Sequence, residues 1–348
     1  MLGVATGDYE ASMTKDQKIV VCGGGGFIGG HLVGELLRRG FSNIRSVDIK
    51  PFDEWYQRFG EAENLQLDLQ HLDACQTALK GANVVYNLAA DMGGMGFIEN
   101  NKCLCMLSVL INTHLCMAAK DAGTVDRFFY ASSACVYNGD KQKDKKIETF
   151  LKEEDAYPAL PEDGYGWEKL FSERMCRHFR EDFGLQCRVA RFHNVYGPFG
   201  TYEGGREKAP AAICRKVISA KMAGKHDIEI WGDGKQTRSF MYISDCLKGI
   251  DMLTHDHDVH GKPSKVLEPI NLGSSELVSI NQLVDIVEEI AGIKLKRNYN
   301  LSAPKGVNGR NSDNTLIKML LGWEPDTRLR DGMEKTYRWI YDQMASAG

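Results

Sequence analysis

Short apolar runs alternate with longer amphipathic segments between residues 17 and 197 of the chain. The first run precedes a glycine cluster, after which apolar residues recur with helical spacing. Apolar runs predict strands at 17–24, 44–49, 84–90, 128–133 and 186–192, and amphipathic segments predict helices at 27–39, 101–122 and 165–183. Strands that alternate with helices predict an α/β fold with a doubly wound parallel sheet.

The pattern changes after residue 197, where turns and charged loops replace the regular alternation. We therefore predict a larger domain at 17–197 and a smaller, mixed α/β lobe at 198–348, with some exchange of elements between them. In doubly wound proteins, ligands bind beyond the carboxyl ends of the strands. The crevice between the two lobes is the expected binding site.

Composition narrows the range of functions. A net charge of −4 provides no strong basic field, so neither nucleic acid nor an anionic membrane is an expected partner. No apolar run of about 20 residues is evident, so we expect no membrane span. The polar, acidic segment 1–17 is not typical of a signal peptide and is expected to be a frayed leader. Ten cysteines, mostly single and within apolar segments, favour buried thiols in a reducing, cytoplasmic compartment.

The glycine cluster follows a predicted strand and opens a predicted helix. Glycines in this context permit a tight turn and let backbone amides approach a pyrophosphate, although a turn without a ligand is the alternative. Asp48 ends the second predicted strand at the position of a ribose-binding carboxylate, which favours NAD over NADP because it would repel a 2′-phosphate. Asp68 is expected near the adenine or, alternatively, is a turn carboxylate. Expected cofactor contacts are Gly23, Gly26, Phe27, Ile28, Gly29, Asp48 and Asp68.

Tyr165 and Lys169 have the YxxxK spacing in the predicted helix at 165–183. Residues four apart share one helix face, so the lysine can lower the pKa of the phenol and can also bind the cofactor ribose. A phenol with a lowered pKa is a usable acid or base near neutral pH. We therefore expect Tyr165 and Lys169 to be catalytic and to contact the cofactor.

Several segments together resemble the extended short-chain dehydrogenase/reductase family. They are the glycine motif, Asn87-Leu-Ala-Ala90, the serine-containing segment at 131–137, YxxxK, and the RFHNVYGP run at 191–198. The resemblance implies a Rossmann-type domain that binds NAD, a smaller lobe that binds a nucleotide sugar, and a catalytic serine, Ser133, beside Tyr165. It also implies a homodimer formed through the two long helices at 101–122 and 165–183.

A narrower set of segments resembles the GDP-mannose 3,5-epimerase branch of that family: 91–97, the segment around Cys135, and 205–210, 231–240 and 309–314. The resemblance implies that C4 of GDP-mannose is oxidised transiently by bound NAD, that Cys135 and Lys208 exchange protons at C5 and C3, and that C4 is reduced again to give GDP-L-galactose. It implies substrate contacts from Gly93, Ser133, Ala134, Cys135, Asn194, Glu207, Lys208, Ala209, Lys216, Gln236, Thr237, Arg238 and Arg310.

Other interpretations stay open at the level of sequence. A 4,6-dehydratase would need an acid pair where Ala134 and Cys135 stand, which argues against it. Another nucleotide-sugar epimerase, a net sugar dehydrogenase and an NAD-binding regulator without catalysis are the remaining alternatives. Individually, Cys135 could be a core thiol, Lys208 a solvated charge, and the arginines surface ion pairs. No metal site is predicted.

Overall fold

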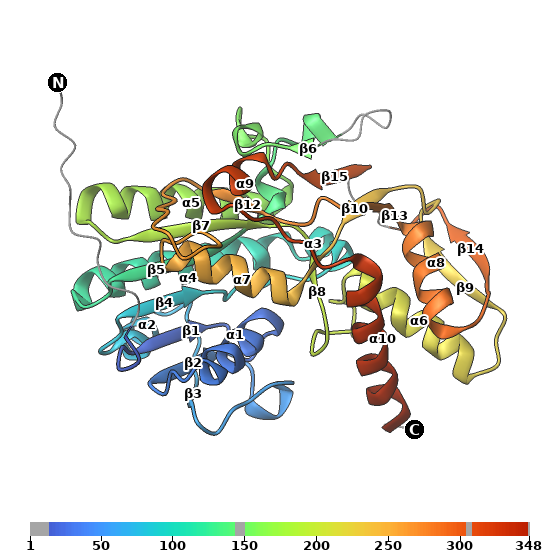
Figure 1. Cartoon of the computed structure of the whole chain (residues 1–348), viewed down its shortest axis with the longest axis horizontal. Helices are drawn as coiled ribbons and strands as arrows, with labels where there is room; N and C mark the ends of the chain where they lie inside the picture. Colours follow the sequence, from blue (N-terminus) through green and yellow to red (C-terminus); the bar gives the residue numbers. More distant parts are fainter. Residues whose placement is uncertain (1–13, 143–149, 304–307, 347–348) are drawn as a thin grey trace.

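A seven-stranded parallel sheet forms the centre of the larger lobe (Figure 1). The computed structural model describes residues 14–142, 150–303 and 308–346, so most of the predicted leader lies outside the described residues. In spatial order the strands are β12 (Ile270–Leu272), β7 (Cys187–Phe192), β5 (Arg127–Ser133), β4 (Val84–Asn87), β1 (Ile19–Cys22), β2 (Ile44–Asp48) and β3 (Glu63–Gln66). The order reverses direction between β1 and β4, which opens a crevice at the carboxyl ends of the strands.

Helices cover both faces of this sheet because its strands are apolar on both sides. In β1, Ile19 and Val21 pack into one hydrophobic cluster, whereas Val20 and Cys22 pack into the other. The first face is covered by α1 (Phe27–Arg38) and α7 (Ile243–Thr254), and the second by α2 (Leu72–Leu79), α4 (Lys102–Ala122) and α5 (Asp163–Phe183). The predicted α/β class with a doubly wound parallel sheet is confirmed.

The smaller lobe lies at the side of the sheet on the right of Figure 1 and is built from short strands and three longer helices. One sheet has the order β13 (Leu277–Ser279), β10 (Thr237–Ser239), β15 (Gly309–Ser312) and β6 (Phe150–Leu151). The other elements of this lobe are β8 (Val195–Tyr196) with β11 (Met241–Tyr242), β9 (Asp227–Trp231) with β14 (Lys296–Asn300), α6 (Ala209–Met222), α8 (Ile280–Ala291) and α10 (Leu329–Ser346). Two short helices contact the larger lobe instead: α3 (Met95–Asn100) contacts α4 and α5, and α9 (Thr315–Leu321) contacts β12.

The chain crosses between the lobes on both sides of residue 197. Strand β12 and helix α7 follow that residue yet belong to the larger lobe, whereas β6 precedes it and pairs with β15 of the smaller lobe. The boundary between 197 and 198 therefore stays a prediction, and no single cut separates the two sets of elements.

Two glycines let α5 approach its neighbours closely. A Cβ atom on Gly164 would lie 2.4 Å from the carbonyl oxygen of Lys102 at the start of α4. A Cβ atom on Gly166 would lie 2.3 Å from the carbonyl oxygen of Cys135, just after β5. The same Cys135 oxygen accepts a 3.0 Å hydrogen bond from the Glu162 N–H. Tyr165, between the two glycines, is thereby held against the end of β5.

Helix α4 is the one helix among the described residues whose length and composition would suffice to cross a membrane. Its inner face packs in the core of the larger lobe, where Leu115 and Cys116 are fully buried, and it contacts both α2 and α5. These contacts explain why the inner face of α4 is apolar, because α4 is a core helix of the larger lobe.

Replacing Gly166 with alanine should destabilise the protein by about 1–3 kcal/mol, because the added methyl group overlaps the Cys135 carbonyl. Urea unfolding of Gly166→Ala measures the change in the free energy of unfolding. Gly60→Ala is the matched control, since no atom lies within 4 Å of the added methyl group, and it should change stability by less than about 0.5 kcal/mol. Equal stabilities of the two variants would contradict the close approach.

Candidate active site

A cavity of about 1070 Å³ lies between the carboxyl ends of the large sheet and the smaller lobe. Every predicted site residue except Thr237 lines it, and all of these residues are described by the structure. Thr237 is an interior position of the small sheet, where its N–H donates to the Asn308 carbonyl. The predicted residues that line the cavity are Gly23, Gly26, Phe27, Ile28, Gly29, Asp48, Asp68, Gly93, Ser133, Ala134, Cys135, Tyr165, Lys169, Asn194, Glu207, Lys208, Ala209, Lys216, Gln236, Arg238 and Arg310.

The first turn of α1 forms a backbone cradle at one end of the cavity. Gly23 adopts a left-handed φ of 85°. A Cβ atom on Gly29 would lie 2.1 Å from the Gly23 carbonyl oxygen, so the turn and helix touch only because residue 29 is glycine. Gly26 caps α1 without a side-chain hydrogen bond. The first amides of a helix capped in this way can bind a phosphate group.

Asp48 is fixed at the end of β2 beside this cradle. Its Oδ2 accepts the Gly25 N–H at 3.0 Å, and its Oδ1 accepts the Lys50 N–H at 3.1 Å. A carboxylate with two oxygens has further acceptor capacity for the hydroxyl groups of a ribose. Asp68 lies in a turn, where its Oδ1 accepts the Gln70 N–H at 2.9 Å. The glycine cradle and the buried Asp48 together fit a dinucleotide whose ribose lacks a 2′-phosphate.

Tyr165 is buried next to Ser133 at the carboxyl end of β5. Burial, together with the charges of Cys135 and Glu168, raises the pKa of Tyr165 well above its usual range, while a hydrogen bond with Ser133 lowers it. The Lys169 ammonium lies 5.5 Å from the centre of the Tyr165 ring and 3.6 Å from the Glu168 carboxylate. Burial therefore determines the direction of the shift in the protein chain alone, and the lowering effect of Lys169 on the phenol pKa stays a prediction.

Cys135 lies in the short turn that follows β5, and its thiol faces the guanidinium of Arg310. Nη1 of Arg310 donates to Sγ of Cys135 at 3.5 Å, and the Cys135 N–H donates to the Ser133 hydroxyl at 3.2 Å. Burial raises the pKa of Cys135, although Arg310 opposes the rise. Burial thus outweighs the nearby guanidinium and favours the thiol form of Cys135 in the chain alone.

Lys208 is the residue that precedes α6, across the cavity in the smaller lobe. Burial lowers the pKa of Lys208, and the charges of Cys135 and Cys246 oppose this effect. The thiol of Cys135 and the ammonium of Lys208 thus shift in opposite directions from their usual values. Both shifts have the same cause, because burial disfavours the charged form of each group.

Two arginines lie side by side where β10 and β15 pair, because Arg238 is in register with Arg310. Burial and then the charge of Arg310 lower the pKa of Arg238 to about 10. Arg310 also donates to Gln142 at 2.8 Å and forms an ion pair with Glu162. Two adjacent buried guanidinium groups favour an anion such as a diphosphate. The sequence analysis did not identify Glu162 or Gln142, because their contacts with Arg310 join segments that are distant in the sequence.

The loop that carries Lys208 packs against the glycine loop before α3. The Gly94 N–H donates to the Arg206 carbonyl at 3.0 Å, and a Cβ atom on Gly94 would lie 2.5 Å from the Glu207 carbonyl oxygen. The Glu207 carboxylate accepts the Gly205 N–H at 2.7 Å and pairs with Arg215 at 3.0 Å. The two loops, which are distant in sequence, therefore hold each other beside the cavity.

The outer end of the cavity carries an aromatic side chain that the sequence analysis did not single out. The Lys216 ammonium lies 5.6 Å from the centre of the Trp231 ring and donates to the Glu229 carbonyl at 2.8 Å. Gln236 donates to the Trp231 carbonyl at 3.1 Å, and its own Oε1 is buried without a hydrogen-bond partner. At the inner end, Asn194 donates to the Ser239 carbonyl at 3.1 Å.

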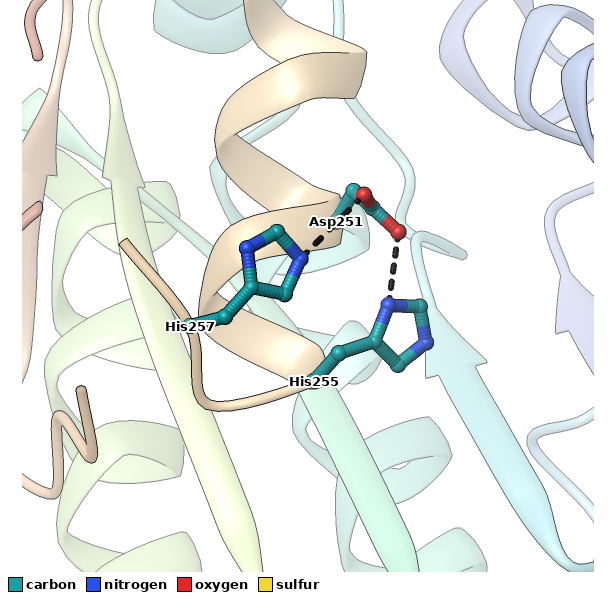
Figure 2. A group of neighbouring side chains, drawn as sticks. All are labelled: Asp251, His255 and His257. Carbon is teal, nitrogen blue, oxygen red and sulfur yellow. Dashed lines mark ion pairs between the residues drawn. The ribbon is translucent and has the colours of Figure 1, made fainter. Parts of the chain in front are cut away.

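A separate cluster lies at the end of α7, away from this cavity. Figure 2 shows the Asp251 carboxylate between the imidazole rings of His255 and His257, at distances of 2.6 and 3.5 Å. It is the one group within the described ranges whose spacing could hold a metal ion. Arg39 pairs with the same carboxylate at 2.5 Å, and its positive charge opposes a second cation there. We therefore interpret the cluster as a network of ion pairs.

Comparison with known proteins reveals similarity over most of the chain. A model of the NAD dependent epimerase/dehydratase family matches residues 19–273. A GDP-mannose 3,5-epimerase 1 from Oryza sativa subsp. japonica is 44% identical, with 98% of this chain and 88% of that protein aligned. A GDP-mannose 3,5-epimerase from Arabidopsis thaliana is 44% identical over 95% of this chain and 84% of its own.

A solved structure has the same fold. It is a UDP-glucuronic acid 4-epimerase from Bacillus cereus in complex with UDP-glucuronic acid and NAD. The TM-score is 0.76, the identity is 25%, and the alignment covers 94% of this chain and 100% of the other.

The cluster of Figure 2 should make stability depend on pH. The hydrogen bond to Asp251 raises the pKa of His257 above its value in the unfolded chain. The interaction therefore stabilises the folded protein fully below about pH 6.5, and this stabilisation is lost as the pH rises through the pKa of His257 in the folded protein. His257→Gln should therefore cost about 0.5–1 kcal/mol at pH 5.5 and less at pH 9 in urea unfolding. The exposed His226→Gln is the control. A cost for His257→Gln that grows with pH would contradict this assignment.

Proposed function

Because the chain belongs to the NAD dependent epimerase/dehydratase family, we propose that it is a nucleotide-sugar epimerase that converts GDP-mannose into GDP-L-galactose. The observation that carries the proposal is one cavity lined by Tyr165, Cys135 and Lys208. A phenol alone would suffice for reversible oxidation at C4. Epimerisation at carbons beside C4 needs a second acid–base pair, and the thiol and amine supply one.

The cavity suits bound NAD at the end formed by β1, α1 and β2. Gly23, Gly26 and Gly29 would bind the pyrophosphate through backbone amides, with Phe27 and Ile28 in the same turn. Asp48 would bind the adenosine ribose, Asp68 would lie near the adenine, and Lys169 would bind the second ribose. When bound, NAD supplies reversible acceptance of a hydride from C4 of the sugar, so the reaction has no net redox change.

Tyr165 and Ser133 would act at the C4 hydroxyl of the sugar. The phenolate of Tyr165 takes the hydroxyl proton during oxidation, and the phenol returns it during reduction. Ser133 donates a hydrogen bond that keeps the phenol oxygen and the substrate oxygen together. Since burial disfavours the phenolate in the chain alone, the positive nicotinamide ring and the Lys169 ammonium are both needed to stabilise it.

Cys135 and Lys208 would invert C5 and C3 while C4 is a ketone. The ketone acidifies the hydrogens on both neighbouring carbons, so one group removes a proton from one face and the other delivers a proton to the opposite face. This exchange requires one member of the pair to be unprotonated, so that it can remove a proton, and the other to be protonated, so that it can deliver one. Burial favours the neutral form of both groups, a protonated thiol and an unprotonated amine.

The remaining cavity residues suit a nucleoside diphosphate. Arg238 and Arg310 would bind the diphosphate, and Lys216, Gln236 and Asn194 would orient the nucleotide and sugar, with Gly93, Ala134, Glu207 and Ala209 close to them. Thr237 stays a predicted contact. A 4-epimerase of another nucleotide sugar is the second candidate, since a solved relative is named as one. That candidate offers no role for Cys135 and Lys208.

The exposed surface and the thiols support two further proposals. Apolar side chains on the outer faces of α4 and α5, among them Leu107 and Phe171, are 41% and 52% exposed. Exposed apolar faces on adjacent helices suit an interface, and we propose a homodimer through these helices. All ten cysteines are free, which is compatible with a reducing, cytoplasmic location. No contact with nucleic acid or a membrane is part of this proposal.

The function is tested by incubating the protein with GDP-mannose and separating the products by chromatography. Wild-type protein should give GDP-L-galactose, whereas Cys135→Ala and Lys208→Ala should each reduce the rate by about 10²–10⁴-fold, because each removes one partner of the proton exchange. Both variants should still bind NAD in a fluorescence titration, since neither residue belongs to the cofactor end of the cavity.

Cys214→Ala is the matched control for the thiol. Cys214 is fully buried in α6 and does not line the cavity, so its loss should leave the rate within about twofold of wild type. Full activity of Cys135→Ala would refute the role of the thiol. A 4-keto-6-deoxy product, or interconversion of C4 epimers alone, would refute the proposed reaction itself.

Charge on the α4–α5 face should separate the proposed dimer. The double variant Leu107→Glu/Phe171→Glu should be monomeric in light scattering at micromolar concentration, because two buried carboxylates per subunit would be desolvated at the interface. Met319→Glu is the control, since Met319 is 71% exposed on α9, outside the α4–α5 face. A wild-type protein that is itself monomeric would contradict the proposal.

A further inference from the structure

A buried carboxylate that the proposed mechanism does not use lies inside the YxxxK segment. Glu168 and Lys169 are both 3% exposed, and the Glu168 Oε2 atom is 3.6 Å from the Lys169 ammonium. Within the described part of the chain, no other carboxylate lies within ion-pair distance of Lys169. The positive charge that should assist Tyr165 is therefore paired with a negative one.

The carboxylate is held in place from two elements. Its Oε1 atom accepts hydrogen bonds from the Tyr130 hydroxyl of β5 at 3.2 Å and from the Ser172 hydroxyl of α5 at 3.4 Å. Its Oε2 atom is buried and has no hydrogen-bond partner. A buried carboxylate oxygen without a hydrogen bond costs free energy. Packing alone therefore does not explain why the Oε2 atom of Glu168 is oriented toward Lys169.

Lys169 is confined by the same neighbours. Its ammonium lies 4.9 Å from the centre of the Tyr130 ring and 5.5 Å from the centre of the Tyr165 ring, with Glu168 on the adjacent position of the helix. The ammonium is thus set between two aromatic faces and one carboxylate.

We propose that Glu168 is a positioning residue: its carboxylate fixes the Lys169 ammonium and offsets its charge, so that Tyr165 ionises only when the positive nicotinamide ring is bound. The inference rests on the proposed function, which assigns NAD and the phenol their roles. The role of Glu168 adds to burial, which already disfavours ionisation of Tyr165 in the chain alone. It also links the first proton transfer to the oxidation state of the cofactor.

The groups that face Tyr165 come from three other elements. They are Cys135 after β5, Cys105 in α4, and Tyr130 with Ser133 in β5, in addition to Glu168 and Lys169 on its own helix. Glu168 and Lys169 form the one ion pair among these groups. Removing one of them therefore changes the net charge beside the phenol by one unit.

The first experiment measures cofactor binding without any sugar. Glu168→Gln keeps the size of the side chain but removes its negative charge, so the dissociation constant of NAD⁺ should rise by about tenfold relative to that of NADH, since only NAD⁺ carries the positive ring. Glu168→Asp keeps the charge and should leave the ratio within about twofold of wild type. This readout is independent of the sugar substrate, so its failure is distinct from failure of the proposed reaction.

The second readout is the pH dependence of kcat. Loss of the carboxylate should favour the phenolate, so the acid limb for Glu168→Gln should move to lower pH by about one unit, whereas Glu168→Asp should retain the wild-type limb. A merely structural role would instead affect the shortened Asp variant as much as the isosteric Gln variant. Equal behaviour of the two variants, or an unchanged binding ratio in Glu168→Gln, would overturn the proposal.

Because Glu168→Gln leaves a buried lysine unpaired, the variant could fail to fold. Lys169→Met and Glu168→Gln/Lys169→Met then provide the test. The single variant leaves an uncompensated carboxylate and should move the acid limb to higher pH, and the double variant should move it back by about one unit. Identical pH profiles for these two variants would overturn the charge role.

Discussion

The close approach of α5 to the end of β5 is the constraint on which the site depends. Gly166 lets the first turn of the helix lie directly on the Cys135 carbonyl, and Gly164 does the same against the start of α4. Tyr165 stands between them, and its phenol forms a hydrogen bond with Ser133. The strand end that carries the thiol and the helix that carries the phenol are therefore one rigid unit, to which the smaller lobe adds Lys208 and the two arginines.

Burial determines the proton affinities within this unit. Desolvation favours the neutral form of every group, so it raises the pKa values of Tyr165 and Cys135 and lowers that of Lys208. The chain alone thus holds a neutral phenol and a neutral thiol in a cavity shaped for charged ligands. Arg310 joins the two functions, because it contacts the Cys135 sulfur while lying beside Arg238, its proposed partner at the diphosphate. In the proposed function, one guanidinium group therefore contacts both the diphosphate and the thiol.

The order of strands and helices in the larger lobe could be predicted because buried parallel strands and amphipathic helices leave clear periodicities. The cavity residues in the glycine motif and in YxxxK could be found because their spacing follows from helix and turn geometry. The return of β12 to the large sheet, the pairing of Arg310 with Glu162, and the place of Trp231 could not be predicted, since each depends on contacts between distant segments. The pKa directions of Tyr165 and Cys135 could not be predicted for the same reason: burial is a property of the packed structure.

The central claim is that one cavity oxidises C4 and exchanges protons at the two neighbouring carbons. Proton NMR of GDP-mannose incubated with the protein in D₂O, without added cofactor, tests it most directly. The C3 and C5 proton signals should be lost as deuterium enters, while GDP-L-galactose accumulates and the C4 hydrogen is retained. Conversion without deuterium at C3 and C5, or no exchange in protein that carries NAD, would contradict it.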